Sequence, residues 1–74
     1  MLKNNIEIDV KVKCIEAEIT QAKLAETVGT TPSYLNRLIK KNDGIVNKVF
    51  IKLMDSLGYD VELMYIKRKK AKND

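Results

Sequence analysis

The chain has 74 residues, with 14 Lys and Arg, 10 Asp and Glu and no His, which gives a formal net charge of +4 at pH 7. A chain this short can form only one domain with a modest core, so we expect its stability to be marginal or shared with a partner. The absence of histidine, the single cysteine and the lack of carboxylate clusters at metal-ligand spacing argue against an enzyme, and we expect no catalytic residue, metal or cofactor.

No stretch approaches the ~18 continuous apolar residues of a membrane span, and residues 1–9 lack the apolar region of a signal peptide. We therefore predict a cytoplasmic protein with no membrane partner. Cys14 fits a reducing compartment, and we expect it to be a small core residue rather than a nucleophile.

The N-terminal stretch carries two conflicting periodicities. Apolar residues alternate with charged ones, which is typical of a strand: Ile6, Ile8, Val10, Val12 and Cys14. Val10 and Cys14 also stand about one helical turn apart, and Asp9 is an acceptable N-cap. Because the two helices that follow need a third to cover their inner faces, we predict a helix over Asp9–Ala17 with Ile6–Ile8 extended.

Residues 20–39, TQAKLAETVGTTPSYLNRLI, predict two short helices joined by a tight turn. Thr20 is a good N-cap for a first helix, and Gly29 can take the left-handed conformation that ends it. Thr31 caps the second helix, and Pro32 suits its first position. Apolar residues then fall on one face of this second helix, namely Leu35, Leu38 and Ile39, and leave a polar face opposite.

The spacing of Gln21, Ala25, Gly29 and Leu35 resembles the helix-turn-helix of the lambda repressor and Cro family, also called the XRE family. The resemblance covers roughly residues 10–58 and is strongest from Thr20 to Leu38. It implies a mainly α, four-helix domain that binds double-stranded DNA sequence-specifically. Ile39 stands where the family often has an acidic residue, so the local backbone contacts can differ.

The resemblance also implies roles for individual residues. Base-reading side chains fall at Pro32, Ser33, Asn36 and Arg37. Candidates for phosphate contacts are Thr20, Gln21, Tyr34, Lys40, Lys41 and Asn42. Residues 37–52 hold five bases against Asp43 alone, the segregation expected of a nucleic-acid surface. Structural readings stay open for three of these features: the lysines can simply solvate helix faces, Gln21 can be a plain capping residue, and Tyr34 can pack at the helix edge.

A fourth helix is predicted over about Val46 to Leu57, with an apolar stripe that should close the core and Gly58 as its stop. The following segment, residues 60–66, predicts a short β-strand, because Val61, Leu63 and Tyr65 alternate with Glu62 and Met64. A lone strand needs a partner for its backbone, and we favour an antiparallel copy in a second subunit, with Val61, Leu63 and Tyr65 at the dimer interface. Pairing with Ile6–Ile8 in the same chain, or a fifth helix, are the alternatives.

The expected organisation is thus a DNA-binding domain over residues 1–66 and a basic, disordered tail over residues 67–74, either a phosphate-seeking arm or a solubilising end. We expect a homodimeric transcriptional repressor on a palindromic operator. The first alternative is an antitoxin that binds both DNA and a toxin protein. The second is a protein-interaction adaptor on the same fold, against which Asn36, Arg37 and the basic block weigh.

Overall fold

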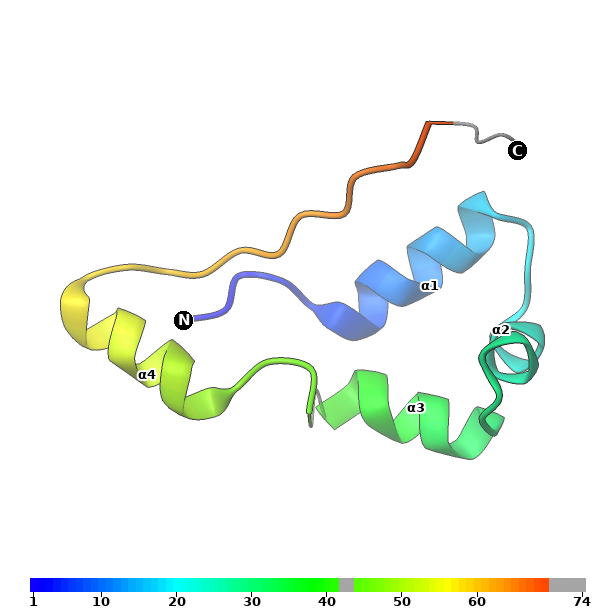
Figure 1. The fold of residues 1–74 in the computed structure, drawn as a ribbon, viewed down its shortest axis with the longest axis horizontal. Helices are drawn as coiled ribbons and strands as arrows, with labels where there is room; N and C mark the ends of the chain where they lie inside the picture. Colours follow the sequence, from blue (N-terminus) through cyan, green and yellow to red (C-terminus); the bar gives the residue numbers. More distant parts are fainter. Residues whose placement is uncertain (42–43, 70–74) are drawn as a thin grey trace.

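The computed structural model describes residues 1–41 and 44–69, and within them the chain is mainly helical, with four helices and no sheet. The helices are α1 (Ile6–Glu16), α2 (Gln21–Val28), α3 (Pro32–Lys41) and α4 (Lys48–Leu57). Helices α1 and α3 lie alongside each other, α2 crosses at one end of this pair, and α4 lies beyond the C-terminal end of α3 (Figure 1). The predicted small four-helix domain is confirmed at this level. No helix in the described ranges has the length and apolarity needed to cross a bilayer.

The core lies where α1, α2 and α3 meet. Its buried cluster consists of Ile6, Ala25, Leu35 and Ile39, and half-buried side chains surround it: Leu2, Val10, Leu24, Val46 and Leu63. Cys14 is also buried, as predicted. Five apolar side chains are buried among the described residues, so the core supplies limited hydrophobic stabilisation, as expected for a chain of this length.

Helix α1 begins three residues earlier than predicted, at Ile6 rather than Asp9, and the extended conformation expected for Ile6–Ile8 is wrong. The side chain of Asn5 caps the helix by accepting a hydrogen bond from the Ile8 amide at 3.1 Å. The earlier start places Ile6 one turn before Val10 on the face that packs against α3, where Ile6 is buried. The alternation of apolar and charged residues did not lead to a strand because the helical conformation buries the Ile6 side chain in the core.

Helix α4 starts at Lys48, with Asn47 as its N-cap, and Gly58 ends it in the left-handed conformation as predicted. The expectation that this helix closes the core is wrong. None of its residues is buried, and it makes no helix–helix packing contact with α1, α2 or α3. The amphipathic pattern correctly indicated an apolar face, but most of that face remains in solvent.

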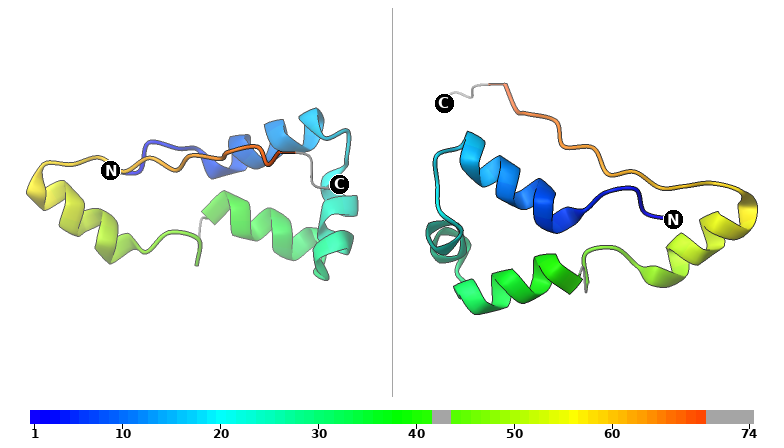
Figure 2. Two further views of the ribbon diagram at one scale, coloured as in Figure 1. Left: turned by 45° about the horizontal axis from the view of Figure 1, so that its top comes forward. Right: turned by 180° about the vertical axis from the view of Figure 1, so that it is seen from behind.

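The segment after α4 runs extended along α1, on the side away from α3, as Figures 1 and 2 both show. Within the described residues it forms an isolated parallel bridge between Leu2 and Val61 rather than the predicted strand. The Lys3 amide donates to the Val61 carbonyl at 2.8 Å, and the Val61 amide donates to the Met1 carbonyl at 2.9 Å. The in-chain partner is therefore the N-terminal arm, residues 1–4, because Ile6–Ile8 are already helical.

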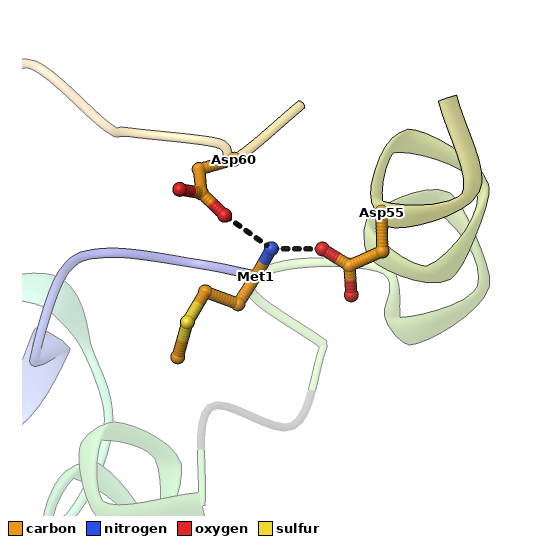
Figure 3. Close-up of polar contacts among 3 residues, drawn as sticks. All are labelled: Met1, Asp55 and Asp60. Carbon is orange, nitrogen blue, oxygen red and sulfur yellow. Dashed lines mark hydrogen bonds and ion pairs between the residues drawn. The ribbon is translucent and has the colours of Figure 1, made fainter. Parts of the chain in front are cut away.

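The α-amino group of Met1 joins the N-terminal arm to α4 (Figure 3). It forms ion pairs with the carboxylate of Asp55 on α4 and, at 3.0 Å, with that of Asp60 just after the helix. The hydrogen bonds to Asp55 and Asp60 raise the pKa of this amino group. All three groups are well exposed, so solvent screening keeps the contribution of these pairs to stability small.

Candidate nucleic-acid interface

Helix α2 and the turn after it are set by two local signals. The Thr20 hydroxyl accepts a hydrogen bond from the Lys23 amide at 3.0 Å, which satisfies one of the free amides at the start of α2. Gly29 ends the helix with φ +81°, and the next amide, that of Thr30, donates back to the Ala25 carbonyl at 2.9 Å. The chain reverses at Gly29 because a residue without a Cβ takes this conformation without strain.

Helix α3 starts immediately after this turn. The side chain of Thr31 caps it by accepting from the Tyr34 amide at 3.1 Å, and Pro32 occupies the first helical position, where its missing N–H costs nothing. Both predicted caps and both predicted helix starts are confirmed. The connection between the two helices is therefore three residues long and held at each end by a specific hydrogen bond.

Helices α2 and α3 are fixed at their crossing by one small residue and two large ones. Ala25 on α2 is 0% exposed, and Leu35 and Ile39 on α3 are buried in the same cluster. A side chain as small as alanine lets the two helices approach closely, and the branched side chains of Leu35 and Ile39 fill the space between α3 and α1. This packing determines which face of α3 is turned outward.

The outward face of α3 is polar and exposed. All four predicted base-reading residues are exposed on this helix: Pro32, Ser33, Asn36 and Arg37. Ser33 and Arg37 lie on the side opposite the buried Leu35 and Ile39, whereas Pro32 and Asn36 lie nearer the edge of the buried face. Their donors and acceptors are free of the core and available to a partner molecule.

Arg37 is oriented by an aromatic neighbour that the sequence argument did not connect with it. The Arg37 guanidinium lies over the ring of Tyr34, with its central carbon 5.5 Å from the ring centroid. Residues three apart on a helix are neighbours, so the i, i+3 spacing was the available signal. A cation–π contact restricts the arginine side chain, and among the ion pairs of the described residues none involves Arg37. The positive charge is thus held in place without being neutralised.

The predicted phosphate-contact residues divide into three groups. Thr20 and Gln21 lie at the N-terminus of α2, where the helix dipole favours an anion, and Gln21 is half-buried. Tyr34 is exposed on α3 beside Arg37. Lys40 and Lys41 are exposed in the last turn of α3.

A structural role for the lysines is compatible with their position, because cations near a helix C-terminus interact favourably with its dipole. The hydrogen bond from Lys11 lowers the pKa of the Glu7 carboxyl on α1, and the nearby charge of Lys40 adds to this effect. Lys40 therefore also acts on α1. Asn42, the sixth predicted phosphate contact, lies outside the described residues.

The predicted dimer residues all contact their own chain in this structure. Val61 bridges to Leu2, Leu63 packs beside the core, and the Tyr65 hydroxyl donates to Asp9 at 2.7 Å. The side chain of Asn4 accepts from the Leu63 amide at 2.7 Å and donates to its carbonyl at 3.0 Å. These contacts use one edge of the extended segment and leave the opposite edge, at Glu62 and Met64, without a backbone partner among the described residues.

The described residues contain no group of three or more Asp, Glu, His or Cys side chains that could hold a metal ion. Comparison with known proteins does not add to this picture: no protein-family model matches the chain, and no curated protein or solved structure matches it significantly.

Proposed function

We propose that this chain is a sequence-specific double-stranded DNA-binding protein of the lambda repressor and Cro type, acting as a dimeric transcriptional repressor. The observation that carries the proposal is the division of α3 into a buried apolar face and an exposed polar face that holds Asn36 and Arg37. A helix anchored this way behind a short turn can enter the major groove with its N-terminal half against the base edges.

Each outward side chain has a chemistry suited to base recognition. The Arg37 guanidinium can donate two hydrogen bonds to guanine O6 and N7, and the Asn36 amide can pair with adenine. Ser33 can bond to several bases, whereas Pro32 offers only apolar contact, for example to a thymine methyl. A good bidentate pair contributes roughly 1–3 kcal/mol of discrimination against the wrong base. Arg37 is the main specificity residue in this proposal because Tyr34 holds it in position.

Backbone contacts supply the remaining affinity. Thr20 and Gln21 at the start of α2, with Tyr34, Lys40, Lys41 and Asn42, are the candidates for phosphate contacts. Phosphate neutralisation releases condensed counterions, so the affinity must fall as the salt concentration rises. A salt-independent affinity would contradict this assignment.

Two copies would bind a palindromic site by pairing the extended segments, residues 60–66, antiparallel about a two-fold axis. This is supported by the backbone edge at Glu62 and Met64, which has no hydrogen-bond partner within residues 1–41 and 44–69, while the side chains of Val61 and Leu63 cover their own domain. The two α3 helices would then lie ~34 Å apart and read half-sites about one helical turn apart. Bound over a promoter in the cytoplasm, such a dimer would block polymerase.

The experiment that tests the proposal is a selection of random duplex DNA on the purified protein at two salt concentrations, read by sequencing. We expect a palindrome with half-sites one turn apart, enriched more strongly at low salt. The variant Arg37→Ala should then relax one position in each half-site. Lys13→Ala is the matched control, because it removes an exposed cation from α1, and it should leave the base preferences unchanged.

The outcomes separate the parts of the proposal. Enrichment of a single half-site would support DNA binding but contradict the strand-mediated dimer. If no sequence is enriched at either salt concentration, the proposal of sequence-specific DNA binding is wrong.

A second candidate function is an antitoxin, in which the same DNA-binding dimer also sequesters a toxin protein. The exposed apolar face of α4 favours it, because an apolar patch outside the dimer interface is the surface such a partner needs. Only the antitoxin function requires this face of α4 to bind a second protein, and such binding can be measured without DNA.

A further inference from the structure

A cleft of about 250 Å³ lies between α1, the first turn of α2 and the extended segment that follows α4. Figures 1 and 2 show this segment running beside α1 toward the end from which the chain leads into α2. Apolar side chains form most of the wall: Val10, Cys14, Ile19 and Leu24. Cys14 is buried and the other three are half-buried, so the cleft reaches the margin of the core.

The cleft is also lined by a carboxylate with an open acceptor position. The Asp9 side chain accepts hydrogen bonds from the Tyr65 hydroxyl at 2.7 Å and from the Asn4 amide at 2.9 Å, both at its Oδ2 atom. Within residues 1–41 and 44–69, no group bonds to the other oxygen, Oδ1, and no cation pairs with this carboxylate. Asp9 is thus held in one orientation with its negative charge uncompensated.

Lys13 brings a positive charge to the same cleft, but that charge is already paired. The Lys13 ammonium lies 3.3 Å from the Glu16 carboxylate, and the Lys13 side chain is 55% exposed. An exposed, paired ammonium is screened by solvent and attracts a ligand anion only weakly. Asp9 is half-buried, so its charge is screened less. The balance of charges therefore favours a cation in the cleft.

The size and lining of the cleft suit a small apolar molecule. Water in an apolar cleft has few groups to bond, so an apolar ligand displaces it favourably. An engineered apolar cavity of about 150 Å³ in another protein holds benzene. A cleft of about 250 Å³ therefore accommodates an aromatic ring with a short chain. A largely apolar wall with a small number of polar groups is also the usual form of a small-molecule site.

We propose that this cleft binds a small primary amine with an aromatic body. The protonated amine donates a charge-assisted hydrogen bond to Asp9 Oδ1, and the ring packs against Val10, Ile19 and Leu24. Because Tyr65 also lines the cleft, the bound amine joins α1, α2 and the extended segment and stabilises the folded chain. The inference is independent of DNA binding, since no residue of the cleft belongs to α3.

The test is a titration of the labelled chain with 2-phenylethylamine at pH 7, without DNA, followed by NMR at the methyl groups of Val10, Ile19 and Leu24. Two probes of the same ring and chain length are compared with it: neutral 2-phenylethanol and anionic 3-phenylpropanoate. We expect saturable shifts of these methyl signals with the amine. The amine should bind roughly 5- to 10-fold more tightly than the alcohol, because only the amine adds ionic attraction to the hydrogen bond. The anion should bind most weakly.

The variant Asp9→Asn separates the charge from the shape of the site. Its amide oxygen can still accept from Tyr65 and Asn4 but carries no charge, so the affinities for amine and alcohol should come within about twofold of each other. Glu7→Gln is the matched control. It removes a carboxylate from the same helix, but that carboxylate pairs with Lys11 and does not line the cleft. This variant should keep the preference for the amine.

Three results with the wild-type chain would overturn the inference, whether or not Asp9→Asn folds. The first is the absence of saturable methyl shifts with the amine. The second is equal affinity for amine and alcohol, which would mean that Asp9 does not select the ligand. The third is a preference for the anion, which would make Lys13 the polar partner. A further variant, Ile19→Phe, fills the cleft without changing Asp9 and should weaken the binding of the amine and the alcohol alike.

Discussion

The central carbon of the Arg37 guanidinium lies over the Tyr34 ring, 5.5 Å from its centroid, and both residues are exposed on α3. Both side chains project from a helix whose other face is fixed in the core, so the pair presents its positive charge in one defined direction. In the proposed DNA complex, pre-orientation of this kind would reduce the side-chain entropy that is lost when the arginine binds a base.

Replacing Tyr34 with leucine should weaken specific DNA binding without changing the fold. A cation–π contact at an exposed site contributes about 0.5–1 kcal/mol, which corresponds to roughly a two- to fivefold loss of affinity. Tyr34→Phe keeps the ring and should retain most of the affinity, unless the hydroxyl itself contacts a phosphate. Fluorescence anisotropy with the selected duplex measures both variants. Equal affinities for wild type and Tyr34→Leu would show that the ring does not position Arg37.

The contact between Asp9 and Tyr65 should make stability depend on pH at both extremes. Hydrogen bonds from Asn4 and then from Tyr65 lower the pKa of Asp9. This contribution is present above the unfolded-state pKa of about 3.9 and is lost as the pH falls through the lower folded value. Burial, together with the bond to Asp9, raises the pKa of Tyr65. Its contribution is present below the unfolded value of about 10 and is lost as the pH rises through the folded one.

The variant Tyr65→Phe should move the pKa of Asp9 upward, toward its ordinary value, and lower the urea midpoint at neutral pH. A carboxyl NMR titration of Asp9 measures the first effect directly. Tyr59→Phe is the control, because Tyr59 is exposed and its hydroxyl bonds to no group among the described residues. An unchanged Asp9 titration in Tyr65→Phe would mean that the C-terminal segment does not rest on α1 in solution.

The turn between α2 and α3 should not tolerate a Cβ at Gly29. Its φ of +81° lies in the left-handed region, which costs an ordinary L-residue about 1–2 kcal/mol. No atom lies within 4 Å of the Cβ position, so the cost of Gly29→Ala is conformational rather than steric. Gly29→Asn should lose less stability, since asparagine tolerates this conformation better. Urea unfolding measures both, and equal losses would contradict the conformational explanation.

The crossing of α2 and α3 should be sensitive to side-chain size at Ala25. Ala25→Leu adds volume at a position with no exposed surface, and overpacking of this kind typically costs about 1–3 kcal/mol. Ala22→Leu makes the same change at an exposed position of the same helix and should be nearly neutral. Thermal unfolding followed by circular dichroism compares the two. A stable Ala25→Leu variant would indicate that the helices cross less closely than the structure shows.

The α2–turn–α3 unit could be predicted almost to the residue because its signals are local. Thr20, Gly29, Thr31 and Pro32 each determine the backbone at their own position, whatever surrounds them. The start of α1 was missed because Asn5 and Asp9 are both suitable caps and the residues between them fit two periodicities. Burial of Ile6 against α3, a tertiary effect, decided between them.

The sequence was less informative about what each apolar face contacts. The stripe on α4 predicted an apolar surface correctly, but periodicity does not say whether that surface meets the core or another molecule. The same holds for residues 60–66, where alternation predicts an extended segment and leaves its partner open. The structure supplies the N-terminal arm as that partner, through an Asn4 side chain whose pairing with Leu63 no sequence pattern indicates.

That pairing limits how far assembly can proceed. The Asn4 amide offers Leu63 one donor and one acceptor, as a neighbouring strand would, and the arm does the same for Val61. Among the described residues only one side of the segment is left without a backbone partner, so in the proposed dimer each copy is joined once and growth stops at two. Unprotected strands with two open sides can add molecules without end and form fibrils. In that dimer, the first four residues would therefore prevent polymerisation through the second edge of the segment.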